Sequence, residues 1–261
     1  KPTSTSWYEL GKVESRSLNT FSAVLMRTDP PFDIEYLNTT WLLSAAVRQG
    51  AKVFNDPTAV RDHSEKLSIT EFPELIPPTL VTRELSAVEA FHQTHRDIVI
   101  KPLDGMGGTG IFRLQHQGLN IGATLETLTQ NGTLPVMAQR YIPEIVKGDK
   151  RILVIDGQPI PYCLARVPQQ GETRGNLAAG GSGVPQLLTP RDYWLASQVG
   201  QELKKRGLLF VGLDVIGDYI TEINVTSPTC IREIDARYQV GIADRLMLVI
   251  EKHLALKKAR V

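Results

Sequence analysis

The feature that most constrains this chain is a pair of apolar runs that carry acids, FVGLDVIGDYITEINVTSPT, at residues 210–229. Gly217–Asp218 separates the runs, and glycine and aspartate together are typical of a tight turn between antiparallel strands. Glu222 and Asn224 are two residues apart and therefore lie on one face of a strand, while Ile223 lies on the other. The segment predicts a hairpin with one apolar face for a core and one polar face for chemistry.

The turn decides whether Asp214 joins the polar face. A regular two-residue turn at Gly217–Asp218 pairs Asp214 with Thr221 and points its side chain to the opposite face. An odd-numbered loop, or a β-bulge, pairs Asp214 with Glu222 instead. Two opposed carboxylates repel each other unless a cation lies between them, and oxygen ligands of this kind suit Mg²⁺. We therefore expect the odd loop or bulge, with Asp214, Glu222 and Asn224 as metal ligands; a solvent-facing polar strand face is the alternative.

A glycine-rich stretch, IKPLDGMGGTGIF, lies between two predicted strands. Gly105, Gly107 and Gly110 have the spacing G-x-G-x-x-G, but a Rossmann site requires a helix after the glycines, and IFRL looks like a strand. A glycine-rich turn between strands resembles a flap whose backbone N–H groups approach phosphate oxygens. Lys101, just upstream, would add a positive charge. An ordinary glycine hairpin with an exposed lysine explains these residues equally well.

Two other phosphate-binding patterns do not fit the sequence. His95-Arg96-Asp97 imitates the catalytic loop of protein kinases, but it precedes the glycines and no Asn follows it at the required spacing. The chain contains no Asp-Phe-Gly and no G-x-x-x-x-G-K-[ST]. Kinase and Walker-type sites are therefore excluded.

Composition narrows the classes of partner. The 261 residues fit one large or two medium domains, and the formal net charge of +1, with lysines and arginines spread along the chain, does not indicate nucleic-acid or membrane binding. No apolar run approaches the roughly 20 residues that span a bilayer, and no signal peptide is visible. Two cysteines imply no disulfide scaffold and fit a reducing compartment. We expect a cytoplasmic protein.

Strands and helices alternate without a strict β–α–β rhythm, which predicts an α+β fold with at least two lobes. Apolar spacing predicts helices, one of them begun by a capping box of Ser86 and Glu89, over residues 38–49, 61–70, 86–93, 191–206 and 241–258. The glycine-rich loop at residues 169–183 is long for a compact domain, and such loops are usually lids or disordered segments.

Taken together, several stretches resemble the ATP-grasp enzymes, and specifically the bacterial glutathione synthetase family. They follow the family's order between Leu25 and Ile234, and they are LMRTDPPFD, SEKL, IKPLDGMGGTGIFR, MAQRYIP, GDKRILVIDG, PYCLARVPQQGETRGNLAAGG and GLDVIGDYITEINVTSPTCIREI. KPLDGMGG, ETRGNLAAGG and EINVTSPT together are far more specific than the glycine spacing alone. The resemblance implies an ATP-grasp fold, in which two α+β lobes clasp ATP after an N-terminal α/β domain.

The resemblance also implies a division of the chain. Family members begin with a further segment of a few dozen residues, so residues 1–62 are expected to be the C-terminal part of the N-terminal α/β domain. Residues 63–143 are expected to form the small ATP-grasp lobe. Residues 144–261 are expected to form the C-terminal lobe, with the acid-bearing hairpin and a lid at residues 169–183.

The implied reaction joins γ-glutamylcysteine to glycine. ATP phosphorylates the cysteinyl carboxylate, and the amine of glycine attacks the acyl phosphate to give glutathione, ADP and phosphate. Phosphoryl transfer depends mainly on positioning and charge neutralisation, and a lid would keep water from the acyl phosphate. ATP is the implied co-substrate and Mg²⁺ the implied cofactor, with Mn²⁺ as an alternative. The resemblance further implies a homo-oligomer, with a tetramer as the expected form.

The resemblance assigns roles to residues around the nucleotide. Lys66 and Lys101 would hold the α and β phosphates, and Asp149 is similar to the family's nucleotide-contacting acid. The hairpin ligands would hold Mg²⁺ between the β and γ phosphates, and Asn224 would also contact the substrate. The flap over the phosphates would comprise Gly105, Met106, Gly107 and Gly108. The segment that reads adenine through its backbone groups would comprise Gln139, Arg140, Tyr141 and Ile142.

The catalytic roles implied by the resemblance fall to three arginines. Arg151 and Arg166 suit the carboxylates of the peptide, and Arg166 would also steady the transferring phosphoryl charge; surface ion pairs are the alternative. Arg174 would move with the lid to the substrate. Thr226 and Ser227 follow the metal strand and would donate to the substrate, although both residue types are also common in turns.

Two other functions stay open at this point. Another ATP-grasp ligase, such as a dipeptide or ribosomal-protein glutamate ligase, would keep the lysines, the flap and the hairpin acids but need not keep ETRGNLAAGG or VTSPT. A non-catalytic ATP-binding protein on the same fold would be expected to lack a metal ligand or a lysine. This chain retains all of them, which favours an enzyme.

Overall fold

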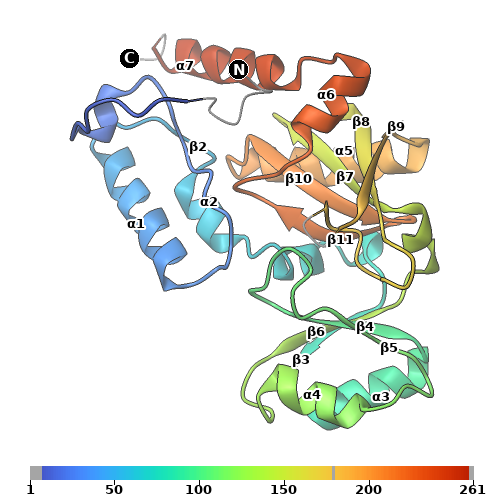
Figure 1. Ribbon diagram of the computed structural model, residues 1–261. Coiled ribbons are helices and arrows are strands. Elements are labelled where there is room, and N and C mark those ends of the chain that lie inside the picture. Colours follow the sequence, from blue (N-terminus) through green and yellow to red (C-terminus); the bar gives the residue numbers. More distant parts are fainter. Residues whose placement is uncertain (1–7, 178–179, 259–261) are drawn as a thin grey trace.

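The computed structural model describes residues 8–177 and 180–258, which form three groups of elements (Figure 1). The N-terminal group contains a two-stranded parallel sheet and two helices, namely β1 (Val24–Leu25), β2 (Val53–Phe54), α1 (Ile34–Arg48) and α2 (Pro57–Asp62). Each of the other two groups is built on an antiparallel sheet. The predicted α+β class is therefore confirmed.

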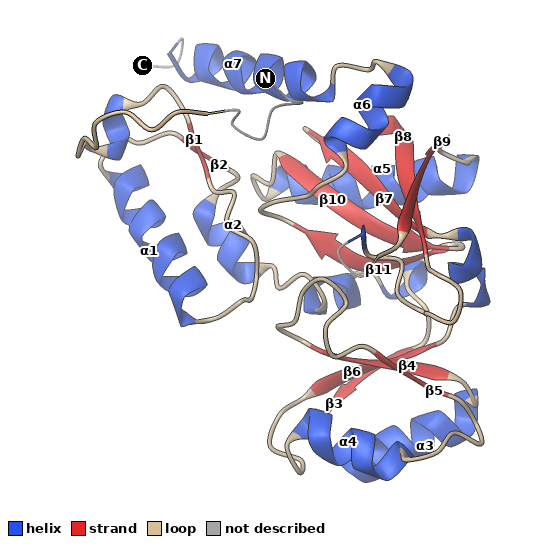
Figure 2. Cartoon of the chain, in the orientation of Figure 1, coloured by secondary structure: helices blue, strands red, loops and turns tan. Residues whose placement is uncertain are grey.

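The smaller lobe is a four-stranded sheet covered by helices on one face only (Figure 2). Its strands, in spatial order, are β3 (Thr79–Thr82), β6 (Val136–Arg140), β4 (Ile98–Pro102) and β5 (Phe112–Leu114), and its helices are α3 (Leu85–His95) and α4 (Ile121–Thr129). Ile98 and Ile100 pack beneath the helices. Because side chains alternate along a strand, Val99 and Lys101 project from the other face, which points toward the larger lobe.

The larger lobe is a five-stranded sheet with helices on both faces. Its strands, in spatial order, are β11 (Tyr219–Asn224), β10 (Phe210–Ile216), β7 (Asp149–Ile155), β8 (Gln158–Val167) and β9 (Ser182–Leu187). Ile152 packs in one core with residues of α5 (Pro190–Lys205), whereas Leu153 packs with residues of α6 (Ile231–Tyr238) and α7 (Ile242–Lys258). Alternation along β7 therefore places Asp149 and Arg151 on the face away from α5.

The hairpin of β10 and β11 contains the predicted bulge. The two-residue turn is kept, with Ile216 opposite Tyr219, and the register then shifts so that Asp214 lies opposite Glu222 and Gly212 lies opposite Asn224. The extra residue moves both carboxylates and the amide to one face of the sheet. The predicted pairing is confirmed, and regular pairing of Asp214 with Thr221 is excluded.

Some local predictions were wrong. Residues 61–70 are not one helix: α2 ends at Asp62, and a 3₁₀ helix, η2, covers Leu67–Glu71. The chain leaves the helix because the carbonyl of Glu65 accepts a hydrogen bond from the Ile223 N–H at 2.9 Å, on the free edge of β11. Helix α3 begins one residue early, with Glu84 as its N-cap and no side-chain cap.

The remaining short elements connect these lobes. Three further 3₁₀ helices are η1 (Leu18–Thr20), η3 (Pro73–Leu75) and η4 (Pro143–Lys147). Helices α4 and α6 and strand β9 were not predicted, and β9 takes over the end of the expected lid loop. Across the described ranges, no helix is both long enough and apolar enough to cross a membrane.

Candidate active site

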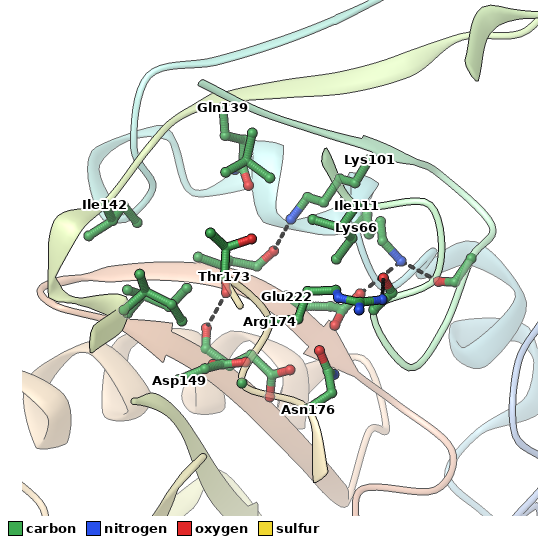
Figure 3. A pocket seen from close by; sticks show the side chains of 18 of the residues that line it. Lys66, Lys101, Ile111, Gln139, Ile142, Asp149, Thr173, Arg174, Asn176 and Glu222 are labelled. Atoms are coloured by element: carbon green, nitrogen blue, oxygen red, sulfur yellow. Dashed lines mark hydrogen bonds and ion pairs between the residues drawn. The ribbon is translucent and has the colours of Figure 1, made fainter. Parts of the chain in front are cut away.

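A cavity of about 110 Å³ lies between the two larger sheets, on the helix-free face of the small lobe (Figure 3). Side chains from both lobes and from the loop after β8 point into it. Every residue predicted to bind the nucleotide lines this one cavity, namely Lys66, Lys101, Gly105, Met106, Gly107, Gly108, Gln139, Arg140, Tyr141, Ile142 and Asp149. The structure thus brings together residues that are up to 83 positions apart between Lys66 and Asp149.

The two lysines are buried and bound to the flap and the hairpin. Lys66 lies 2.9 Å from the Glu222 carboxylate and donates to the Gly105 carbonyl, and Lys101 donates to the Thr221 carbonyl at 3.0 Å. Lys101 is only 6% exposed, and burial lowers its pKa to about 8 against the opposing influence of Glu222. A surface hairpin with an exposed lysine is therefore the wrong interpretation of the glycine stretch.

The glycine stretch is a turn between strands β4 and β5, as the flap interpretation requires. Gly107, Gly108 and Gly110 have positive φ angles of 63°, 83° and 72°, which glycine adopts without a side-chain clash. A Cβ at Gly108 would lie 2.8 Å from the Asn176 side-chain oxygen, and Arg174 donates to the Gly108 carbonyl at 3.5 Å. The flap and the predicted lid therefore touch each other.

The larger sheet presents four buried charges beside the cavity. Asp149, Arg151, Arg166 and Asp214 are each at most 8% exposed. Arg151 donates through Nη2 to Asp214 at 3.2 Å, and Arg166 lies 2.8 Å from Asp214 and also pairs with Asp149. The alternative interpretation, in which Arg151 and Arg166 form surface ion pairs, is therefore wrong. The four charges form one buried network.

This network shifts the acidity of its carboxyl groups in opposite directions. Burial raises the pKa of Asp149 to about 6, although the Arg166 guanidinium acts against that rise. Burial also acts to raise the pKa of Asp214, but Arg151 and Arg166 outweigh it and hold that pKa well below its usual value. Asp149 Oδ1 is buried and accepts no hydrogen bond from the described residues. Because that oxygen is already out of contact with water, it can accept a hydrogen bond from a ligand at little desolvation cost.

The chemistry of the hairpin donors fits a hard divalent cation. Asp214, Glu222 and Asn224 present carboxylate and amide oxygens on one sheet face, beside the unsatisfied oxygen of Asp149. Here Asp214 is paired with arginines and Glu222 with Lys66, so these cations supply the neutralisation that opposed acids require. The described residues contain no group of three or more His, Cys, Asp or Glu side chains placed to hold a metal.

Most of the predicted peptide-binding residues do not line the cavity. Arg151 lies opposite Asp214 and Arg166 lies opposite Asp149, whereas Asn224 lies opposite Gly212. Arg151 approaches the Asn224 oxygen at 3.5 Å. Thr226 and Ser227 lie farther along, where Ser227 donates to Asp29. Of the residues predicted to act on the peptide, only Arg174 reaches the cavity itself.

Sequence reasoning missed the apolar wall of the cavity and one acid beside it. The wall comprises Val99, Ile111, Ile145 and Ile216. Val99 and Ile216 could have been predicted, because side chains alternate along a strand and each of these residues lies two positions from a predicted site residue. Glu65 is also close: burial and the nearby Glu222 raise its pKa to about 8.

The predicted lid lies in the cavity. Its segment from Thr173 to Asn176 lines the space beside the flap, while residues 178–179 of the predicted lid are outside the described residues. The predicted lid and the glycine flap therefore border the same cavity.

Comparison with known proteins gives consistent matches. The ATP-grasp domain of prokaryotic glutathione synthetase matches residues 65–239, and the N-terminal domain of the same enzyme matches residues 1–61. A glutathione synthetase of Bordetella parapertussis is 60% identical over 94% of this chain and 77% of its own length. One from Pseudomonas aeruginosa is 57% identical over 96% of this chain and 79% of its own length. The solved structure of the D-cycloserine synthetase DcsG aligns with a TM-score of 0.67 over 91% of this chain and 87% of its own, at 18% identity, and this likeness shows the fold alone.

Proposed function

The chain belongs to the prokaryotic glutathione synthetase family, and we propose how its residues carry out the ligation. The protein is an ATP-dependent carboxylate–amine ligase: it joins γ-glutamylcysteine and glycine through an acyl phosphate and releases glutathione, ADP and phosphate. The observation that carries this function is the 60% identity over 94% of the chain. Residue roles follow from the geometry around the cavity.

The nucleotide is proposed to bind in the cavity between the lobes. Its phosphates meet the ammonium groups of Lys66 and Lys101 and the backbone N–H groups of the glycine flap, which approach without steric hindrance. Its adenine meets the backbone of residues 139–142, against the apolar wall formed in part by Val99 and Ile145. The Tyr141 N–H is already bonded to the Asp97 carbonyl at 2.9 Å, which fixes that segment.

Asp214, Glu222 and Asn224 are proposed to hold Mg²⁺, with Mn²⁺ as the alternative. When bound, the ion would supply charge neutralisation for the β and γ phosphates. Arg151 and Arg166 hold the carboxylates of the peptide, and Arg166 also faces the transferring phosphoryl group. The buried network that fixes both guanidinium groups supports this role, because preorganised charges need no rearrangement during the reaction.

The lid is proposed to exclude water from the acyl phosphate. Its Arg174 already bonds to the flap, which supports a movement of lid and flap together. Thr226 and Ser227, with Asn224, contact the peptide at the far end of the sheet face. We keep the division of the chain into residues 1–62, 63–143 and 144–261. We also propose that the protein is cytoplasmic and forms a homotetramer. Light scattering on the purified protein tests the tetramer.

Phosphate release with γ-glutamylcysteine as carboxylate and a panel of amines tests the function. Glycine should support release, and alanine, serine and glutamate should support it far less. Strong release with another amine would assign a different ATP-grasp ligase. Tight ADP binding without release from any pair would identify a non-catalytic nucleotide-binding protein.

A further inference from the structure

The turn that joins β10 and β11, Gly217–Asp218, is held by two cations that lie outside the hairpin. Lys150 of β7 donates to the Gly217 carbonyl at 2.9 Å, and Arg191 of α5 donates to the Asp218 carbonyl at 3.3 Å. Neither Lys150 nor Arg191 lines the cavity. Both backbone acceptors of the turn are therefore fixed from the α5 side of the sheet.

Lys150 is itself fixed by a buried acid. Its side chain is 12% exposed and forms an ion pair with Asp192, which is fully buried. Asp192 also accepts from the Thr189 N–H at 3.1 Å, in a capping box at the start of α5. A buried carboxylate held by a helix cap has little freedom. Asp192 thus holds the Lys150 ammonium group in place, within hydrogen-bond distance of the Gly217 carbonyl.

The other side of the turn packs against the segment proposed to read adenine. A Cβ at Gly217 would lie 3.3 Å from the Glu144 side chain and 3.4 Å from the Ile142 side chain, so the turn backbone packs closely against both side chains. Arg140 donates to the Tyr219 hydroxyl at 3.2 Å. The turn therefore lies between the adenine segment and the clamp formed by Lys150 and Arg191.

Resting on the proposed function, we infer that Lys150 is a positioning residue for the reaction. It holds the turn against residues 140–144 and so fixes the distance from the adenine segment to Asp214 and Glu222, which lie a few residues along the two strands. A nucleotide whose adenine binds at residues 140–144 then has its phosphates at a fixed distance from Asp214 and Glu222. Loss of the clamp displaces the hairpin, and misplacement by about 1 Å lowers turnover by roughly 100-fold.

Three variants and one matched control test this role. Lys150→Met removes the clamp but leaves Asp192 without its cation, so Lys150→Met with Asp192→Asn removes both charges. Lys150→Arg keeps a cation that donates to both acceptors. Lys204→Met is the control, because Lys204 pairs with Asp156 at 3.0 Å and lies at the opposite end of α5 from Asp192. Each protein is measured for kcat, for KM of ATP, for the unfolding midpoint and for hydrogen exchange of residues 210–224.

The two methionine variants should lower kcat by about 10- to 100-fold while KM for ATP changes far less, because the groups that bind ATP remain. Exchange in the hairpin should accelerate in both. Lys150→Arg should recover most of kcat, and Lys204→Met should resemble the parent in kcat and hairpin exchange.

A folded double variant with parental kcat and parental hairpin exchange would overturn the inference. Failure of both methionine variants to fold would do so too, since Lys150 would then be a structural residue. If the parent releases no phosphate with γ-glutamylcysteine and glycine, the proposed function fails instead. Hairpin exchange in the ADP-bound proteins then still decides the role of Lys150.

Discussion

Replacing Lys101 with methionine should weaken nucleotide binding and stabilise the ligand-free protein near neutral pH. Burial lowers the pKa of Lys101 from 10.5 to about 8. At about 1.4 kcal/mol for each factor of ten in acidity, holding the charged ammonium in the folded protein costs about 3 kcal/mol. Methionine removes this cost but leaves the Thr221 carbonyl without its donor, a loss of about 1–3 kcal/mol. The variant should therefore gain about 0–2 kcal/mol in free energy of unfolding at pH 7.

The pH dependence distinguishes this explanation from a general effect of removing charge. The unfolded chain keeps the Lys101 proton up to its ordinary pKa of 10.5, whereas the folded protein loses it near pH 8. Between these values the unfolded state binds more protons, so the stability of the parent rises with pH. The advantage of Lys101→Met should shrink over that window. Urea unfolding at several pH values measures the difference, with Lys205→Met, whose side chain is 73% exposed, as the control.

Calorimetry with ADP and a chelator tests the binding half of the prediction. An ammonium–phosphate hydrogen bond is worth about 1.5–3 kcal/mol, so Lys101→Met should bind ADP about 10- to 100-fold more weakly. Parental affinity in the variant would refute the assignment of Lys101 to the phosphates. A variant several kcal/mol less stable than the parent at pH 7 would show that this lysine supports the fold instead.

Three further outcomes are expected. Asp214→Asn should lower the free energy of unfolding, measured by urea titration, by about 3–5 kcal/mol, because it leaves buried guanidinium charge unpaired. The control is Asp97→Asn, at the partly exposed pair with Arg113. It should lower the free energy of unfolding by less than about 1 kcal/mol. Glu222→Gln should lower phosphate release by about 100-fold or more with a circular dichroism spectrum like the parent's, and parental turnover would remove Glu222 from the site. Trypsin should cut after Arg174 in the free protein and be blocked by ATP with γ-glutamylcysteine; equal cleavage with and without them would contradict the lid.

Local patterns predicted the flap and the polar face of the hairpin, whereas the roles of Lys66, Asp149 and residues 139–142 came from the family resemblance. Glu222 and Asn224 share a face because strand side chains alternate, and this holds wherever the strand lies. The flap followed from glycines placed between two strand-like runs, since only a bare backbone turns there with positive φ. The opposition of Asp214 and Glu222 was expected from the metal hypothesis through an odd loop or a bulge, and a bulge produces it.

Local sequence is thus enough to predict which side chains share a face and where the backbone can approach a phosphate, because both depend on neighbours a few residues away. What those faces contact depends on how the lobes and strands pack in three dimensions. Residues 61–70 do not form the predicted helix, because this segment bonds to the edge of β11. Lys66 thereby reaches the cavity and pairs with Glu222, 156 positions later in the chain. Asp214 found its guanidinium partners on two other strands, and Lys150 reached the turn across the sheet. Such contacts depend on strand order and on burial of charge, and residue spacing along a chain carries neither.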